Sequence, residues 1–289
     1  MEEGIVGKRF LIYVTKYKDP ELKVTNRIKK YLEEHGQEVF TLIVEKDWKL
    51  GEQEENQFPE NIDIMLVLGG DGTVLQAARE TIHMHIPLIG VNLGTLGFMT
   101  QIELSNLENA LDRLMAGDYR EQSRMLLHGN AELKNGELHE GLALNDIVIT
   151  RQGALRVILL HIYVNGSFLH EYQADGMIVT TPTGSTGYNL SAGGPLVEPG
   201  AKVMTLTPIC PHSLNHRSII LSPEDVVEIE IPLGKEGKEQ VVLAHLDGAG
   251  SFELRTGERI RICQGAESAR FIQLSKVSFL EALHQKMKD

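Results

Sequence analysis

The fold of this chain is decided by one stretch, Ile62-Asp63-Ile64-Met65-Leu66-Val67-Leu68-Gly69-Gly70-Asp71-Gly72-Thr73. Its apolar run over 62–68 predicts a buried strand, and the glycines that follow predict a tight turn. Leu75, Ala77, Ala78 and Ile82 then recur at the spacing of a helix. The stretch therefore predicts a strand, a turn at its carboxyl end, and a helix over 73–82.

The turn carries one carboxylate among three glycines. Glycines let a backbone approach a ligand closely, and the free N–H groups of a helix N-terminus bind phosphate. A carboxylate repels phosphate unless it handles a proton or a metal. We therefore interpret Asp71 as a general base in phosphoryl transfer to a hydroxyl. A plain turn in which Asp71 caps the following helix is an equally open interpretation.

The composition is ordinary for a globular protein, with 42% hydrophobic and 24% charged residues in a chain of 289. A net charge of −12 opposes non-specific binding to nucleic acid, although local amide groups still bind small anions. No apolar run approaches the ~20 residues that a membrane span needs, and residues 1–4 show no secretory signal. We expect a cytoplasmic protein that binds neither nucleic acid nor a membrane.

Strands and helices alternate through residues 1–100. Apolar runs over 9–14, 38–44, 62–68 and 87–91 predict four strands, with helices after the first and the third. This alternation predicts a doubly wound parallel sheet whose ligand site lies outside the carboxyl ends of its strands.

Three of the expected helix ends carry capping signals. Asp19 is expected to be the N-cap of the first helix, with Pro20 in its first position. Ser105 and Glu108 have the spacing of a capping box, which predicts a helix that stops at Gly117.

From residue 119 the pattern changes to short β-branched runs separated by hairpin signals, Asn135-Gly136, Asn165-Gly166 and Asp247-Gly248. This pattern predicts a larger all-β domain of about ten strands. We place the α/β domain at 1–100 and the β-rich domain at 101–275. A helix over 276–289 is expected to pack back on the first domain.

A second polar constellation lies in the β-rich domain. The loop Thr181-Pro182-Thr183-Gly184-Ser185-Thr186-Gly187-Tyr188-Asn189 offers hydroxyls for hydrogen bonds and one aromatic ring for stacking on a base. Upstream, Asn145-Asp146 at the edge of an apolar strand suits a sugar diol. A solvated loop and a simple strand end are the plain alternatives.

In this order the motifs resemble the NAD kinase family. The resemblance covers residues from about 60 to 225. It is carried by Gly69-Gly70-Asp71-Gly72-Thr73, Gly94-Thr95-Leu96-Gly97-Phe98, Asn145-Asp146, Asp175-Gly176, the loop over 181–189 and Thr207-Pro208-Ile209-Cys210-Pro211-His212-Ser213-Leu214. The first motif is shared with diacylglycerol, sphingosine and phosphofructo-kinases, whereas the 181–189 loop is specific.

The resemblance implies phosphorylation of the adenosine-ribose 2′-hydroxyl of NAD by ATP with a divalent metal ion, Mg²⁺, to give NADP. It also implies a homo-oligomer, a dimer or tetramer. Asp71 matches the family's proton acceptor, and Gly69, Gly70, Thr73 and Gly94 are expected at the phosphates of ATP. The expected NAD contacts are Gly72, Phe98, Asn145, Asp146, Arg156, Gln173, Asp175, Thr186, Gly187, Tyr188, Asn189 and Ser191. The metal ligands are unknown at this stage.

Four positions depart from the family's pattern. Asp146 stands where Glu is usual, Gly187 where Ala is common, and Ala249 where Gln is often found. Gln173 is a polar residue where enzymes strict for the oxidised cofactor carry Arg or Gly, which predicts some activity on NADH. Two other functions stay open: a dinucleotide-binding regulator without turnover, and a superfamily kinase that acts on another hydroxyl.

Overall fold

The computed structural model describes residues 7–44, 58–94, 97–153, 157–212, 217–275 and 278–286. The chain forms two compact units, one of Met1–Ser123 with Ala269–Asp289 and one of Arg124–Ser268. The expected boundary at residue 100 falls inside the first unit, and the C-terminal residues 276–289 belong to that unit.

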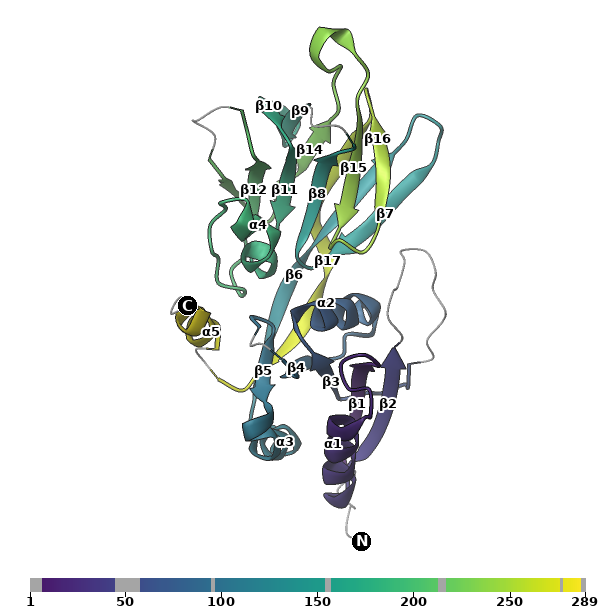
Figure 1. Cartoon of the computed structure of the whole chain (residues 1–289), viewed down its shortest axis with the longest axis vertical. Coiled ribbons are helices and arrows are strands. Elements are labelled where there is room, and N and C mark those ends of the chain that lie inside the picture. Colours follow the sequence, from purple (N-terminus) through teal and green to yellow (C-terminus); the bar gives the residue numbers. More distant parts are fainter. Residues whose placement is uncertain are drawn as a thin grey trace. The chain divides into compact units, whose positions relative to one another are not determined.

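The first unit is built on a parallel sheet (Figure 1). Its strands are β1 (Arg9–Thr15), β2 (Glu38–Val44), β3 (Ile64–Gly69), β4 (Leu88–Asn92) and β5 (Thr100–Glu103). They lie in the order β2-β1-β3-β4-β5 and are all parallel. The end of β17 (Arg259–Gln273) joins β4 through Phe271, which pairs with Leu88.

Helices cover both faces of this sheet. α1 (Lys23–Glu34) and α3 (Leu107–Ala116) lie on one face and α2 (Asp71–Glu80) on the other. The unit also contains α5 (Ser278–Lys286) and the 3₁₀ turns η1 (Ile82–Met84) and η2 (Leu104–Asn106). Leu32 of α1 and Leu111 of α3 pack in one cluster with Ile12 of β1. Tyr13, which points the opposite way, donates a 2.9 Å hydrogen bond to Glu80 at the end of α2. The predicted doubly wound α/β domain is therefore confirmed.

Two predicted helix starts are wrong. The first helix begins at Lys23, with Leu22 in a left-handed conformation at its N-cap. Asp19 still caps it from a distance, because its carboxylate accepts hydrogen bonds from N and Oγ1 of Thr25. α3 begins at Leu107 without a side-chain cap, because Ser105 lies in the preceding 3₁₀ turn.

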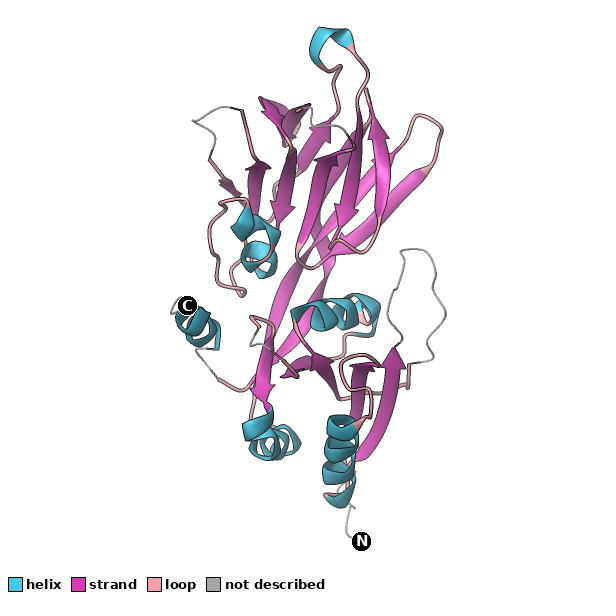
Figure 2. Cartoon of the chain, in the orientation of Figure 1, coloured by secondary structure: helices cyan, strands magenta, loops and turns pink. Residues whose placement is uncertain are grey.

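The second unit consists almost wholly of strands (Figure 2). They are β6 (Arg120–Glu132), β7 (Leu138–Ala143), β8 (Asp146–Arg151), β9 (Ile158–Val164), β10 (Ser167–Ala174), β11 (Gly176–Thr180), β12 (Met204–Ile209), β13 (Ile219–Leu221), β14 (Val227–Glu230), β15 (Val241–Leu246), β16 (Ser251–Arg255) and β17. β6 begins in the first unit, and β17 ends there. The short helices are η3 (Thr183–Thr186), α4 (Tyr188–Ser191) and η4 (Lys235–Gly237).

These strands form two layers around one core. One sheet has the order β13-β12-β11-β8-β15-β16, and β10-β9-β14-β17 with β6 and β7 form the other. The core between them includes Ile147 and Val179 from the first layer and Leu160, Ile229 and Ile260 from the second. The predicted β-rich domain is confirmed.

The three predicted hairpin turns are present. Asn135-Gly136 joins β6 to β7, Asn165-Gly166 joins β9 to β10, and Asp247-Gly248 joins β15 to β16. At Asn165-Gly166 and Asp247-Gly248 both residues have positive φ, which is the geometry that tight hairpins require.

The predicted C-terminal helix is present as α5. The ring of its Phe279 lies 6.0 Å from the ring of Phe98, and Nζ of its Lys286 lies 5.1 Å from the centre of the Phe98 ring. Of the helices that the structure describes, not one combines the length and the apolar character that crossing a membrane requires.

Candidate functional site

Asp71 is the first residue of α2 and lies at the carboxyl end of β3. One of its carboxylate oxygens accepts a hydrogen bond from the Phe98 N–H and the other from the Met99 N–H, each at 2.9 Å. Backbone groups close to thirty residues further along the chain therefore hold this side chain in one orientation. An acid fixed in this way at the carboxyl edge of a parallel sheet stands where such sheets bind their ligands.

One glycine of this turn allows a close contact between the end of β3 and the start of α2. A β-carbon on Gly69 would lie 2.7 Å from Cβ of Thr73, so Thr73 packs directly on the end of β3. Gly70 is the N-cap of α2 in an extended conformation, and Gly72 is exposed. At the end of β4, Gly94 donates its N–H to the side chain of Asn92 at 3.0 Å.

In the second unit, Asn145 and Asp146 stand at the start of β8. Asp146 is only 7% exposed, and no hydrogen bond to its carboxylate comes from the described residues. Burial first, and then the negative charge of Asp247, raise the pKa of Asp146 to about 7. Asn145 Oδ1 is buried and lacks a hydrogen-bond partner among the described residues. Buried polar atoms of this kind normally have partners, so this corner is suited to a ligand that donates hydrogen bonds.

The hydroxyl-rich loop packs against this pair. The carbonyl of Asn145 accepts hydrogen bonds from Oγ1 of Thr180 and the N–H of Thr181, both at 2.9 Å. Oγ1 of Thr181 donates to the carbonyl of Leu144 at 2.5 Å. A β-carbon on Gly184 would lie 2.6 Å from the carbonyl carbon of Asn145, so only glycine fits there.

The predicted residues of this loop divide into two groups. Tyr188 is 45% exposed, Ser191 is exposed, and Thr186 and Gly187 are partly exposed, so all four are accessible to a ligand. Asn189 is fully buried: its Nδ2 donates to the carbonyls of Ser185 and Pro195, and its Oδ1 accepts a hydrogen bond from Thr207. Its amide therefore ties the loop to β12.

Gln173 lies near the end of β10, and Asp175 is the single residue that connects β10 to β11. Asp175 forms an ion pair with Arg151, with 3.2 Å between Oδ1 and Nε. The carbonyl of Gln173 accepts a 2.8 Å hydrogen bond from the N–H of His212. Arg156 lies outside the described residues.

Asp247 also belongs to this corner, although it was not predicted as a site residue from the sequence. Its carboxylate accepts hydrogen bonds from the N–H groups of Leu144, Asn145 and Asp146. The Asp-Gly signal pointed to the hairpin turn alone, because a turn explains an aspartate at that position by itself.

Comparison with known proteins identifies the family. The profile of the ATP-NAD kinase N-terminal domain matches residues 10–119, and that of the C-terminal domain matches residues 144–274. An NAD kinase of Lachnoclostridium phytofermentans is 41% identical over 285 residues, which cover 98% of this chain and 99% of that protein. The chain belongs to the NAD kinase family. An NAD kinase of Lachnospira eligens is 42% identical over 97% of this chain and 100% of its own length.

Solved structures of the family share the fold. A crystal structure of yeast NADH kinase complexed with NADH superposes with a TM-score of 0.82, at 23% identity over 98% of this chain and 88% of that chain. A crystal structure of an NAD kinase from Archaeoglobus fulgidus in complex with ATP gives a TM-score of 0.75, at 23% identity over 97% of this chain and 99% of that chain. The two-domain NAD kinase fold expected from the motifs is therefore confirmed.

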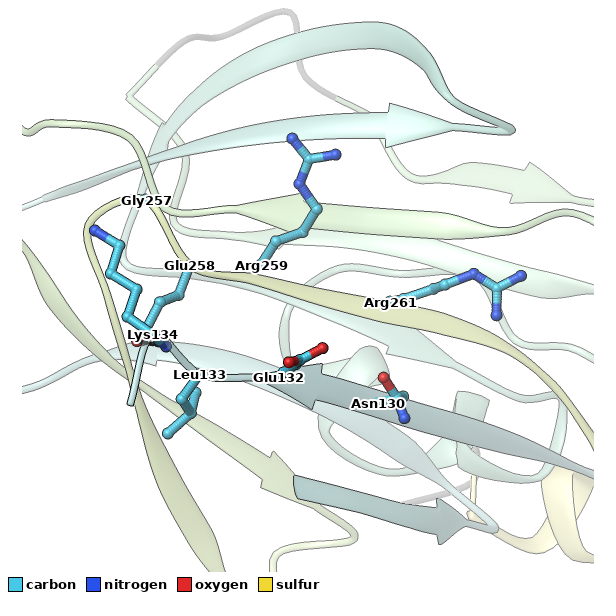
Figure 3. Close-up of a pocket in the computed structure, with 8 residues that line it drawn as sticks. All are labelled: Asn130, Glu132, Leu133, Lys134, Gly257, Glu258, Arg259 and Arg261. Carbon is cyan, nitrogen blue, oxygen red and sulfur yellow. Dashed lines mark hydrogen bonds between the residues drawn. The ribbon is translucent and has the colours of Figure 1, made fainter. Parts of the chain in front are cut away.

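A groove of about 360 Å³ in the second unit is separate from the motifs of the NAD kinase family (Figure 3). It is lined by Asn130, Glu132, Leu133, Lys134, Gly257, Glu258, Arg259 and Arg261. Nζ of Lys134 donates to the carbonyl of Thr256 at 2.6 Å, and Arg259 forms ion pairs with Glu228 and Glu230. Because Arg259 is already paired with two carboxylates and Glu132 and Glu258 also line the groove, it is poorly suited to an anionic nucleotide.

Proposed function

We propose that this protein transfers the γ-phosphoryl group of ATP to the adenosine-ribose 2′-hydroxyl of NAD and so forms NADP. The observation that carries the proposal is the fixed carboxylate of Asp71, held by the N–H groups of Phe98 and Met99 at the end of β3. A regulator without turnover has no need of an acid oriented in this way. The family membership supplies the substrates.

Asp71 acts as the general base. As the bond from the 2′-oxygen to the γ-phosphorus forms, the bond from that phosphorus to the β,γ-bridging oxygen breaks and ADP leaves. The proton of the 2′-hydroxyl passes to the carboxylate of Asp71. Proton transfer of this kind contributes ~10²–10⁴-fold to the rate. Gly69, Gly70, Thr73 and Gly94 surround the triphosphate, where glycines leave the backbone free to approach oxygen atoms.

Asn145 and Asp146 bind the adenosine ribose. The carboxylate of Asp146 accepts hydrogen bonds from sugar hydroxyls, which suits a buried acceptor that has no internal donor among the described residues. Tyr188 stacks on the adenine, with Thr186, Gly187 and Ser191 around it, and the buried amide of Asn189 holds the loop in place behind them. Gly72, Phe98, Arg156, Gln173 and Asp175 complete the contacts with the dinucleotide.

A divalent cation bound with ATP, Mg²⁺ in this proposal, would offset the charge of the phosphates. Among the residues that the structure describes, no three His, Cys, Asp or Glu side chains cluster to hold a metal ion. Mg²⁺ is usually held by substrate phosphates and one or two carboxylates, so in this proposal the triphosphate of ATP supplies most of its ligands.

Three finer features belong to the same proposal. NADH is a second acceptor, because the polar Gln173 stands where strict NAD enzymes carry Arg or Gly. The protein works in the cytoplasm and assembles as a homo-oligomer, a dimer or tetramer, as the family resemblance implies. The rate of phosphorylation of NADH is compared with that of NAD under the same conditions. If NAD is phosphorylated and NADH reacts only at the background rate, NADH is not a substrate.

A coupled assay for NADP tests the main proposal. Purified protein with NAD, ATP and Mg²⁺ is expected to form NADP, and Asp71→Asn protein is expected to form almost none while it still binds NAD. If the wild-type protein binds NAD without forming NADP, the regulator function replaces this one. Phosphorylation of a different hydroxyl compound in place of NAD would favour the other superfamily kinases.

A further inference from the structure

The turn between β15 and β16 contributes a carboxylate to the Asn145-Asp146 corner. We propose that Asp247 is a positioning residue that sets the orientation of Asn145 and Asp146 toward the adenosine ribose; the inference rests on the proposed function. Asp247 lies in the hairpin loop and reaches this corner through its side chain.

The contacts form a compact clamp. Oδ2 of Asp247 accepts a hydrogen bond from the Leu144 N–H at 2.8 Å. Its Oδ1 accepts from the Asn145 N–H at 2.8 Å and from the Asp146 N–H at 3.1 Å. In return, the Asp247 N–H donates to the Asp146 carbonyl at 3.0 Å. Three consecutive amides that point at one carboxylate force the backbone to curl around it, which fixes the direction of both side chains.

The hairpin turn alone does not explain an aspartate here. Asp247 has φ of 52° and Gly248 has φ of 66°, and Asn-Gly satisfies such a turn as well as Asp-Gly. An asparagine would also avoid placing a second negative charge beside the buried Asp146, whose pKa Asp247 helps to raise. The repulsion between Asp146 and Asp247 is therefore offset by a contact that asparagine makes less well. This contact is the acceptance of hydrogen bonds from three N–H groups by one carboxylate.

Asp247→Asn is the direct test. Asparagine tolerates the left-handed backbone, so the turn is kept, but its Nδ2 faces an N–H group and the clamp loses at least one bond. The KM for NAD is expected to rise about tenfold, because the loss of a hydrogen bond to a charged group lets Asn145 and Asp146 move away from the orientation that binds the ribose. The KM for ATP is expected to change less than about twofold, because ATP does not contact this corner in the proposed function. The kcat is expected to fall as well, because the 2′-hydroxyl that attacks belongs to the ribose held by Asn145 and Asp146.

Glu258→Gln is the matched control. Glu258 is 6% exposed, and its carboxylate likewise accepts backbone hydrogen bonds, from Lys134 at 2.9 Å and Arg255 at 2.7 Å. These turns carry none of the proposed site residues. The control is expected to lower the melting temperature as much as Asp247→Asn does, with an unchanged KM for NAD.

Direct titration with NAD separates this inference from the proposed function. Calorimetry measures the affinity whether or not NADP forms, so absence of turnover by the wild-type protein would overturn the function alone. If Asp247→Asn does not fold, Asp247→Glu keeps the charge, moves the carboxylate by one methylene, and is expected to weaken NAD binding as well. An NAD affinity of the folded variant within about twofold of wild type, or an equal loss in Glu258→Gln, would overturn the role of Asp247.

Discussion

Gly97 and Asp71 are in direct steric contact. A β-carbon on Gly97 would lie 2.5 Å from Cγ and 2.8 Å from Oδ2 of Asp71, far inside van der Waals distance. The Asp71 carboxylate is thus enclosed by the backbone of residues 97–99, which supplies both its hydrogen bonds and the wall behind it. The glycine is needed for this close approach and not for an unusual backbone angle.

Gly97→Ala is therefore expected to displace Asp71 and to lower kcat by at least about tenfold. A methyl group that takes the place of the carboxylate forces the side chain out of the two hydrogen bonds to Phe98 and Met99. Steady-state kinetics at saturating NAD and ATP measure the loss, and a melting curve shows whether the variant is folded. A folded variant with wild-type kcat would mean that the orientation of Asp71 does not matter.

Asp71→Asn removes the base and keeps the size of the side chain, although its Nδ2 then faces one of the two N–H groups that hold Asp71. The expected loss in kcat is ~10²–10⁴-fold, the usual contribution of general base catalysis. NAD affinity, measured by calorimetry without ATP, is expected to stay within about threefold of wild type. A kcat within tenfold of wild type contradicts the assignment of Asp71 as base.

The raised pKa of Asp146 predicts how NAD affinity depends on pH. Burial and the charge of Asp247 place this pKa at about 7, so the carboxylate ionises as the pH rises through neutrality. If the ionised form accepts hydrogen bonds from the ribose, NAD binds more tightly at pH 8 than at pH 6. Calorimetric titration of NAD alone checks this, because ATP and its own titration are absent. Asp146→Asn is expected to remove the dependence, and an unchanged pH profile in that variant would assign it to another group.

Stability is expected to change with pH in the opposite direction. The pKa of Asp146 is higher in the folded protein than the ordinary value of 3.8, so the folded state binds this proton more tightly than the unfolded state does. The contribution to the free energy of unfolding is complete below pH 4 and is lost as the pH rises toward 7. Denaturant titrations across this range measure the free energy of unfolding of the wild type and of Asp146→Asn. The part of the pH dependence that comes from Asp146 is expected to be absent in the variant.

Gly184 and Gly187 form a matched pair for stability. A β-carbon at Gly184 would lie 2.6 Å from the carbonyl carbon of Asn145, whereas at Gly187 the nearest atom, the carbonyl oxygen of Gly184, is 3.3 Å away. Gly184→Ala is therefore expected to lower the melting temperature by several degrees more than Gly187→Ala. Equal melting temperatures would mean that the loop relaxes freely away from Asn145.

The parts of the fold that the sequence predicted are those set by local patterns. The apolar run over 62–68 and the Asn165-Gly166 pair each specify their element within a few residues, and both elements are present. Helix starts were predicted less well. Asp19 caps α1 across several intervening residues through Thr25, and Ser105 was expected to cap a helix that begins two residues later.

Long-range contacts in the candidate site could not be predicted from spacing. Asp71 binds amides close to thirty residues away, and Asp247 binds amides about a hundred residues away. Such contacts depend on how sheets are assembled, and a single sequence carries no periodic signal for them. At Asp247 the hairpin turn explains the aspartate by itself, so no pattern in the sequence indicated its hydrogen bonds to the amides of residues 144–146.

Tyr188 and Leu190 separate base stacking from loop packing. The two side chains stand in one short helix and are 45% and 43% exposed, so truncating either is expected to cost little stability. Tyr188→Ala is expected to raise the KM for NAD several-fold, because an aromatic ring that stacks on adenine contributes about 1 kcal/mol beyond its buried area. Leu190→Ala, the control, is expected to leave the KM for NAD unchanged. Equal effects of the two substitutions would show that the loop acts through its packing and that Tyr188 has no stacking role.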